Sequence, residues 1–119
     1  MKESKSEIFA LQADICKTLS DTTRLMILHE LRDEELSVGE LVSRLDLPQS
    51  NVSRHLAVLR ERDIVATRRE GTTIYYRLSN PKIGEACDIV REVLETSLER
   101  NRVLAGSLSA LKREKRGSR

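Results

Sequence analysis

The segment from residue 49 to residue 62 carries the side chains best suited to binding chemistry in this chain. One edge of it is apolar at helical spacing, which predicts a helix that faces a core through Val52, Leu56 and Leu59. The opposite edge, near the start of that helix, presents amide, hydroxyl and guanidinium groups from Gln49, Ser50, Ser53 and Arg54. Such groups hydrogen-bond the base edges and phosphate oxygens of DNA. The segment is therefore a candidate DNA-recognition helix.

The residues before this segment predict three further helices. Apolar spacing marks one over residues 8–19, and Asp21 is placed to cap a second, whose core face carries Leu25, Leu28 and Leu31. Ser37 and Glu40 have the spacing of a capping box, which starts a third helix with an apolar side formed by Val38, Leu41, Val42 and Leu45. The turn at residues 46–48 ends in proline, which suits the first position of the recognition helix. Two short helices joined by such a turn form the helix-turn-helix pattern.

After Asp63 the pattern changes from helical to extended. Two runs rich in β-branched and aromatic residues, 64–69 and 73–78, flank a turn in which Gly71 can take the positive φ of a hairpin. A basic hairpin directly after a helix-turn-helix is the wing of a winged helix. The candidate DNA contacts are thus Gln49, Ser50, Ser53, Arg54, His55 and Arg60 in the helix, and Arg68, Arg69, Thr72 and Thr73 in the wing. For His55 we expect either a phosphate contact or a role in orienting the helix.

The residues after Ser79-Asn80-Pro81 predict one long final helix with a heptad seam. Every seventh residue forms one series along it: Ile83, Val90, Ser97, Leu104 and Leu111. A second series follows four residues after each of the first four members: Cys87, Leu94, Asn101 and Leu108. So long a helix cannot bury its whole stripe against so small a core, so we expect a partner chain, most simply in a two-fold homodimer. An intramolecular covering helix is the alternative. The expected interface comprises Ile8, Ile15, Ile83, Cys87, Val90, Leu94, Asn101 and Leu104.

Length and charge place further bounds on the protein. Its 119 residues predict a single domain over residues 1–111, followed by a basic, disordered tail at 112–119. Six arginines oppose three carboxylates between residues 48 and 77, and five basic residues oppose one glutamate in the tail. Local basic surface on a chain of net charge +2 suits phosphate binding. No apolar run approaches the roughly 18–20 residues that cross a bilayer, and two cysteines fit a reducing cytoplasm.

Four segments together resemble the ArsR/SmtB family of small bacterial and archaeal repressors. They are residues 19–28, residues 49–60, the Arg69-Glu70-Gly71 turn and the Tyr75-Tyr76-Arg77-Leu78 run, and the resemblance covers roughly residues 8–100. It implies a mainly α fold with a small β-hairpin, a winged helix-turn-helix whose long first and last helices form the dimer interface. It also implies a repressor that leaves its operator when an inducer binds or a thiol is modified.

Some positions depart from that family's pattern. Thr22 stands where the family often has proline, and Asp63 where it often has glycine; aspartate tolerates the left-handed conformation at some cost in strain. Ser37 and Gly39 occupy the cysteine positions of the arsenite- and cadmium-type sensors. The final helix has no histidine, so the zinc- and nickel-type ligands are missing as well. We therefore expect no metal at these sites and no cofactor.

Cys16 and Cys87 remain as candidates for the sensor. The first lies on the apolar face of the first helix and the second on the heptad seam. The functional hypothesis is a disulfide or polysulfide bridge that shifts the dimer away from its DNA-binding shape. The alternatives are two small buried hydrophobes, or a metal or metalloid held at a non-standard cysteine site.

Other function classes have less support in the sequence. It has no phosphate-cradling glycine-rich loop, no nucleophile–base pair and no cluster of metal ligands, so we do not expect an enzyme. A winged-helix protein-interaction module is an open alternative. We expect a cytoplasmic, homodimeric transcriptional regulator that binds double-stranded operator DNA in a sequence-specific way. The two half-sites of the operator should lie about one helical turn, roughly 34 Å, apart. Its inducer cannot be read from the sequence.

Overall fold

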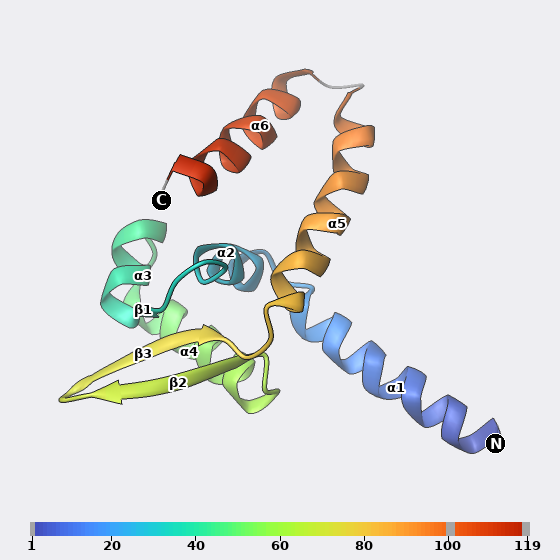
Figure 1. The fold of residues 1–119 in the computed structure, drawn as a ribbon, viewed down its shortest axis with the longest axis horizontal. Helices are drawn as coiled ribbons and strands as arrows, with labels where there is room; N and C mark the ends of the chain where they lie inside the picture. Colours follow the sequence, from blue (N-terminus) through green and yellow to red (C-terminus); the bar gives the residue numbers. More distant parts are fainter. Residues whose placement is uncertain (1, 100–101, 118–119) are drawn as a thin grey trace. The chain divides into compact units, whose positions relative to one another are not determined.

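The computed structural model describes residues 2–99 and 102–117. Its elements in chain order are α1 (Lys2–Leu19), α2 (Thr22–Glu30), β1 (Leu36–Ser37), α3 (Val38–Leu45), α4 (Gln49–Glu61), β2 (Val65–Glu70), β3 (Thr73–Leu78), α5 (Lys82–Leu98) and α6 (Arg102–Gly117) (Figure 1). The chain forms two compact units, Met1–Gly84 and Glu85–Arg119, where the sequence predicted one domain to residue 111. The first unit contains the predicted winged helix-turn-helix.

The helix starts follow the capping residues in the sequence. The Asp21 carboxylate accepts a hydrogen bond from the backbone N–H of Arg24, 3.1 Å away, at the start of α2. Ser37 and Glu40 form both bonds of the predicted capping box, at 3.2 and 2.9 Å. Pro48 occupies the N-cap of α4, one residue before the predicted position, with a φ of −58°. These contacts fix where the helix-turn-helix begins and how its second helix leaves the turn.

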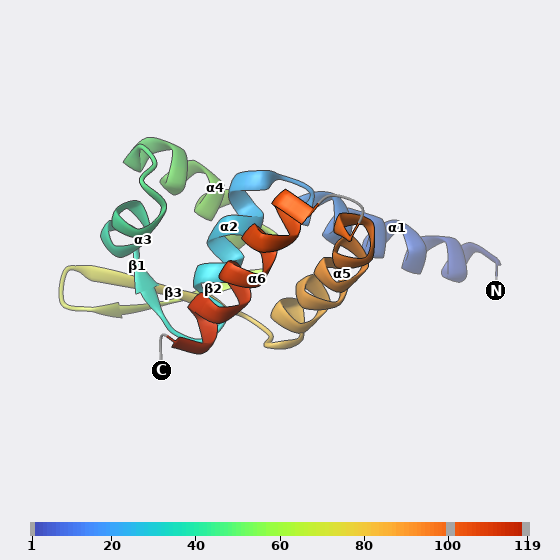
Figure 2. The ribbon, with the colours of Figure 1, turned by 90° about the horizontal axis from the view of Figure 1, so that it is seen from above.

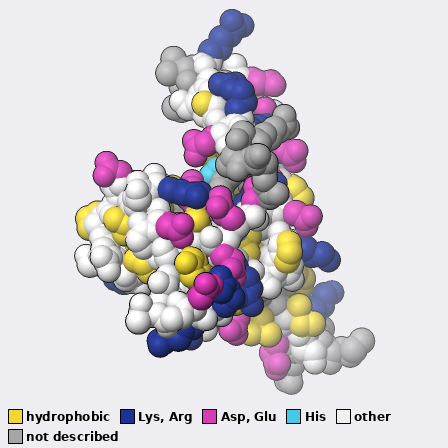
Figure 3. All heavy atoms as spheres, turned by 60° about the vertical axis from the view of Figure 1, so that its left-hand side comes forward, with side chains coloured by type: hydrophobic (Ala, Val, Ile, Leu, Met, Phe, Trp, Pro, Cys, Tyr) yellow, Lys and Arg dark blue, Asp and Glu magenta, His cyan; other side chains and the backbone are white. Residues whose placement is uncertain are grey.

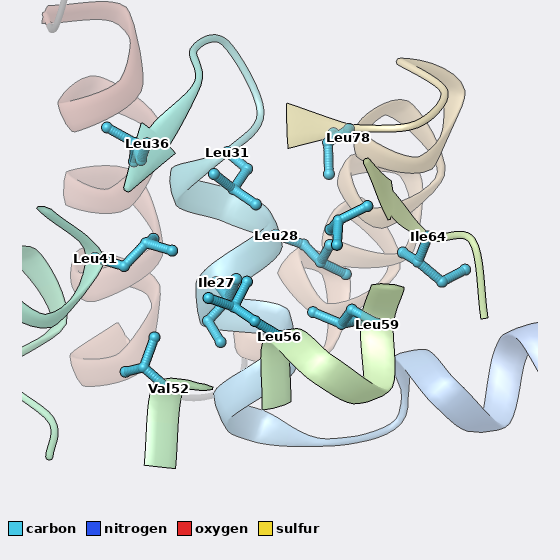
Figure 4. Packing of buried hydrophobic residues seen from close by; sticks show 11 residues of the cluster. Ile27, Leu28, Leu31, Leu36, Leu41, Val52, Leu56, Leu59, Ile64 and Leu78 are labelled. Carbon is cyan, nitrogen blue, oxygen red and sulfur yellow. The ribbon is translucent and has the colours of Figure 1, made fainter. Parts of the chain in front are cut away.

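The core of the first unit lies between α2, α3, α4 and the sheet. Its buried side chains are Ile27, Leu28, Leu31, Leu36, Leu41, Val52, Leu56, Leu59, Ile64, Val65 and Leu78 (Figure 4). The predicted apolar edge of α4 is confirmed, since all three of its residues have 0% exposure. On α2 the prediction was wrong for Leu25, which is 43% exposed while Ile27 is buried in the core. Residues 27, 28 and 31 therefore face the core, so two of the three predicted residues are confirmed.

The sheet is antiparallel with strand order β1-β3-β2. The β2–β3 hairpin, residues 65–78, is the wing, and it reaches away from the helices of this unit in both views (Figures 1 and 2). Gly71 has a φ of +64° in its turn, as the sequence predicted. The two-residue strand β1 was not predicted because it is too short for a periodic signal. It pairs Leu36 with Tyr76 and joins the wing to the residue before α3.

Two aspartates adopt the left-handed conformation in this unit. Asp63, after α4, has a φ of 58°, which confirms the left-handed conformation expected at a position where the family often has glycine. Asp46, with a φ of 54°, ends α3. Both are of a residue type that tolerates this region better than most.

The long final helix predicted from the heptad spacing is wrong as a single element. Helix α5 ends at Leu98 and α6 begins at Arg102. Ser97, a polar position of the predicted seam in the last turn of α5, has lower helix propensity than the leucines around it. Asn101 itself lies outside the described residues. In the second unit, the Lys112 ammonium and a Glu95 carboxylate oxygen pair at 2.7 Å between α6 and α5.

The basic end of the chain also differs from the prediction. Helix α6 continues to Gly117, whereas a disordered tail was expected from residue 112. Lysine, arginine and glutamate are good helix formers, so charge alone was a poor guide to disorder there. Within the described ranges, no helix has both the length and the apolar character of a bilayer-spanning segment.

Replacing Asp63 with glycine is expected to stabilise the protein. Glycine adopts a positive φ without the clash of a Cβ atom, so Asp63→Gly should raise the free energy of unfolding by about 0.5–1 kcal/mol. Gly71→Ala, at a φ of +64° with open space around the added methyl, should lower it by a similar amount. Urea denaturation at one fixed protein concentration measures both; a less stable Asp63→Gly would contradict the strain argument.

Candidate nucleic-acid interface

The outward edge of α4 is a polar surface held in place by the buried edge. Gln49, Ser50, Ser53, Arg54 and Arg60 are all exposed. The three apolar residues of the same helix that were predicted to face the core are buried. The start of a helix also carries a partial positive charge and unpaired backbone N–H groups, which favour anionic ligands. The edge therefore combines hydrogen-bonding side chains with a favourable field for phosphate.

Asn51 orients the arginine of this edge. Arg54 donates from Nη2 to the Asn51 side-chain oxygen at 2.6 Å, across one turn of α4. The bond holds the guanidinium over the first turns of the helix and leaves its other N–H groups for a ligand. Asn51 was not among the predicted site residues, although its spacing of three from Arg54 is the signal that could have identified it.

His55 faces the start of α2 rather than the open edge of α4. Its side chain is 12% exposed, and its Nδ1 accepts a hydrogen bond from Arg24 Nε at 3.2 Å. An Asp21 carboxylate oxygen lies 3.8 Å from the same Nδ1. Arg24 also donates to the Thr18 carbonyl at 2.9 Å, so it connects the end of α1, the start of α2 and α4. The contacts favour the orienting role among the two expected for His55.

The Asp21 carboxylate is stabilised in its ionised form by this arrangement. The hydrogen bond from the backbone N–H of Arg24 is the largest cause that lowers the pKa of Asp21, and the positive charge of the Arg24 guanidinium lowers it further. The same carboxylate caps α2 and lies beside the imidazole of α4. One acidic side chain thus serves both the helix start and the orientation of α4.

One face of the wing holds a group of paired charges, which we call the wing ion cluster: Glu35, Arg68, Glu70 and Arg77. Arg68 Nε lies 3.0 Å from Glu35 and its Nη1 lies 2.7 Å from Glu70, while its guanidinium stacks 4.8 Å from the centre of the Tyr75 ring. Arg77 Nη1 is 3.8 Å from the other Glu35 oxygen. The hydrogen bonds that Arg68 donates to Glu70 and Glu35 raise the pKa of Arg68. Arg68, a predicted DNA contact, is therefore bound to the protein's own carboxylates.

The other wing candidates lie differently. Arg69 and Thr72 are exposed and Thr73 is half-buried. Arg69 points to the opposite sheet face from Arg68, and it forms no ion pair with any residue in the described ranges. On the molecular face that Figure 3 presents, basic and acidic side chains are interspersed rather than separated. Some of the six arginines counted between residues 48 and 77 are thus paired with carboxylates of the protein, so fewer of them are available to a ligand than the sequence suggested.

The predicted sensing and interface residues can be placed only in part. Cys16 is exposed on α1, Cys87 is half-buried on α5, and the two cysteines lie in separate compact units. Ile83 is half-buried and packs against the core of the first unit, and its place in a dimer interface stays a prediction. The exposed members of the predicted interface are Ile8, Ile15, Val90 and Leu94. Asn101 and the side chain of Leu104 lie outside what the structure describes.

Comparison with known proteins identifies the family. Residues 21–67 match the family model described as bacterial regulatory protein, arsR family. The transcriptional activator HlyU of Vibrio cholerae is 43% identical over 79 residues, which cover 66% of this chain and 73% of that protein. The chain belongs to the ArsR family. Two further ArsR relatives are KmtR of Mycobacterium tuberculosis, 45% identical over 75 residues, and the biofilm growth-associated repressor of Agrobacterium fabrum, 49% identical over 70.

The matched part of these two ArsR relatives is less than two thirds of their length. It covers 63% of this chain and 58% of KmtR, and 59% of this chain and 60% of the Agrobacterium repressor. Two solved structures share the fold over more of the chain. Reduced HlyU has a TM-score of 0.68 at 39% identity, covering 78% of this chain and 97% of that one. The homodimeric winged helix-turn-helix domain of Mb0332 from Mycobacterium bovis has a TM-score of 0.72 at 28% identity, covering 82% and 90%.

These matches confirm the predicted ArsR family and the winged helix-turn-helix fold. The relatives are transcriptional regulators rather than enzymes, as the sequence also predicted for this chain. The family match spans α2 through the first residues of β2, so it includes the whole helix-turn-helix.

Proposed function

We propose that this protein is a cytoplasmic transcriptional regulator that binds double-stranded operator DNA as a homodimer. The single observation that carries the proposal is α4, whose one edge is fully buried while the other exposes amide, hydroxyl and guanidinium groups. This is the arrangement of a recognition helix that enters the major groove by its N-terminal end. Family membership supports the same function.

Specific readout in this proposal comes from Gln49, Ser50, Ser53 and Arg54. Arginine recognises guanine through two hydrogen bonds to O6 and N7, and glutamine recognises adenine in a similar way. The bond from Arg54 to Asn51 supports such readout because it holds the guanidinium in one orientation before DNA arrives. Arg60 and the wing then serve the phosphate backbone, which positions the protein without reading sequence.

The homodimer is supported by the apolar side chains that the single chain leaves exposed. On α1 they are Ile8, Phe9, Leu11 and Ile15, and on α5 they are Ile89, Val90, Val93 and Leu94. Ile8 is 63% exposed and Val90 69%. Several large apolar side chains exposed along one helix mark an interaction site. Mb0332, which shares the fold, is described as a homodimer. We therefore propose that α1 and α5 contribute to the contact between protomers.

We propose repression as the outcome of operator binding. The relatives include both an activator, HlyU, and a biofilm growth-associated repressor. The repressor has the higher sequence identity, and repression is what the family resemblance of the sequence implied. A reporter gene placed behind the chain's own promoter would distinguish the two outcomes by the sign of the change in expression.

Substitution of Arg54 tests the proposed recognition helix. Arg54→Ala should weaken operator binding by about 1–3 kcal/mol for each arginine that contacts a base, and should reduce discrimination against a scrambled duplex. Lys5→Ala, which removes one exposed positive charge from α1, serves as the matched control. Fluorescence anisotropy with both duplexes gives the dissociation constants. Salt-insensitive or absent binding of the wild type to DNA would favour a protein-interaction module instead, and an unchanged affinity of Arg54→Ala would exclude Arg54 from the contact.

A charge on the exposed face of α1 tests the proposed dimer. Ile15→Glu should shift the protein towards monomer, because a carboxylate buried in an apolar interface without a partner is strongly unfavourable. Gln12→Glu, on the same helix, introduces the same charge at a polar position and should leave the dimer intact. Sedimentation velocity reports the oligomeric state, and operator affinity should fall together with dimer content. A fully dimeric Ile15→Glu would exclude this face of α1 from the interface.

We also propose that Cys16 and Cys87 act as the sensing thiols. The exposed thiol of Cys16 is accessible to an oxidant, and one HlyU structure is designated reduced. Hydrogen peroxide would accept two electrons and two protons from two thiols, leaving a disulfide and water. Oxidised protein should bind operator more weakly, while Cys87→Ser should bind equally well before and after treatment. Unchanged affinity of the oxidised wild type would reject this sensor, and a loss caused by added metal or metalloid alone would favour a cysteine metal site.

A further inference from the structure

We propose that Glu35 is a specificity-determining residue that keeps one face of the wing electrically neutral. It holds Arg68 and Arg77 in the wing ion cluster, so that Arg69 is the wing arginine available to DNA phosphates. The inference rests on the proposed DNA binding, and it reassigns Arg68 from a DNA contact to a structural residue. The arguments come from sheet register, ion-pair geometry and the charge balance of the two faces.

Sheet register places the members of the cluster on one face. Arg68 pairs with Tyr75 and Ala66 with Arg77, and side chains of paired residues project to the same side of a sheet. Ser37 pairs with Tyr75, so Glu35, two residues before it, lies at the same face. The opposite face carries Val65 and Leu78, which are buried in the core, and then Arg69. The two faces of the wing therefore carry different arginines.

The donor groups of Arg68 are already used within the protein. Nε and Nη1 are directed to two different carboxylates, and the flat side of the guanidinium covers the Tyr75 ring. An isolated exposed pair contributes little, but these contacts form a network in which one arginine has two acidic partners and one acid has two basic partners. A phosphate would have to displace both carboxylates from Arg68. Arg69 has no such competitor among the described residues.

The cluster contains two arginines and two glutamates, so its charges cancel. Phosphate contacts increase affinity for every DNA sequence alike, whereas base contacts discriminate between sequences. A neutral wing face thus lowers the affinity for non-specific DNA without weakening the contacts of α4. Glu35 can do this because strand β1 fixes the chain beside the wing, where one carboxylate reaches two arginines.

Removal of the Glu35 charge should therefore strengthen binding to DNA of any sequence. For Glu35→Gln, the slope of log affinity against log salt on a scrambled duplex should become steeper by about one to two, with about three- to tenfold tighter binding at low salt. Glu61→Gln is the matched control, because Glu61 is exposed at the end of α4 and has no ion pair within the described residues. An equal change in slope for both variants would overturn the proposal.

Two further variants separate the roles of the arginines. Glu35→Gln/Arg68→Gln removes one opposite pair and should bind the operator within about twofold of wild type, with an unchanged salt slope. Arg69→Gln should flatten the slope by about two, since a dimer loses two phosphate contacts of about 0.9 each. A loss of tenfold or more with a flatter slope in the double variant would show that Arg68 itself contacts phosphate, and would reject the inference.

Thermal denaturation of each variant establishes that the fold is retained. If Glu35→Gln lowers the melting temperature, Glu70→Gln supplies the same test: it removes one of the two carboxylate partners of Arg68 and leaves Arg77 paired, so it should give about half the increase in slope. Failure of wild-type protein to bind any duplex would contradict the proposed function. Normal operator binding by wild type, with no steeper slope in either glutamate variant, would instead reject only the role of Glu35.

Discussion

The structure of the first unit depends on the burial of one edge of α4. Val52, Leu56 and Leu59 are fully removed from solvent against α2, α3 and the base of the sheet. Each such side chain contributes about 1.5–3 kcal/mol by burial, far more than any single polar contact on the open edge. The orientation of the polar edge is therefore a by-product of the core. Substitutions on that edge can change what the protein binds without changing how the helix is held.

Polar contacts refine the orientation that the core provides. The Arg24–His55 bond ties the middle of α4 to the start of α2, and Asp21 supports both residues while it caps α2. The Arg54–Asn51 bond then fixes a guanidinium on the open edge. The Arg24–His55 bond joins residues that are far apart in the sequence, and the Arg54–Asn51 bond joins side chains one turn apart on the same helix. They convert a helix that is merely buried on one side into one whose functional groups have defined directions.

Short-range signals in the sequence predicted the helix-turn-helix and wing well. Capping residues, helical spacing and the glycine turn are local, and each appeared where expected. The predictions that were wrong depended on how elements pack together or on contacts between distant residues, which local sequence signals do not contain. Leu25 has the helical spacing of a core residue but is exposed, whereas Ile27 on the same helix is buried. The heptad spacing predicted one continuous helix, whereas α5 ends at Leu98 and α6 begins at Arg102. Arg68 had the charge of a DNA contact, while its partner Glu35 lay 33 residues away.

Strand β1 has a mechanical consequence despite its two residues. Its pairing of Leu36 with Tyr76 joins β3 to the segment from which α3 starts, and α3 leads through one turn into α4. The wing is thereby hydrogen-bonded to the segment from which α3 starts, and α3 and α4 pack against the same core. A protomer built in this way has little freedom to bend its wing against its recognition helix. In a dimer, the separation and tilt of two stiff bodies are then the coordinates on which a regulatory signal can act.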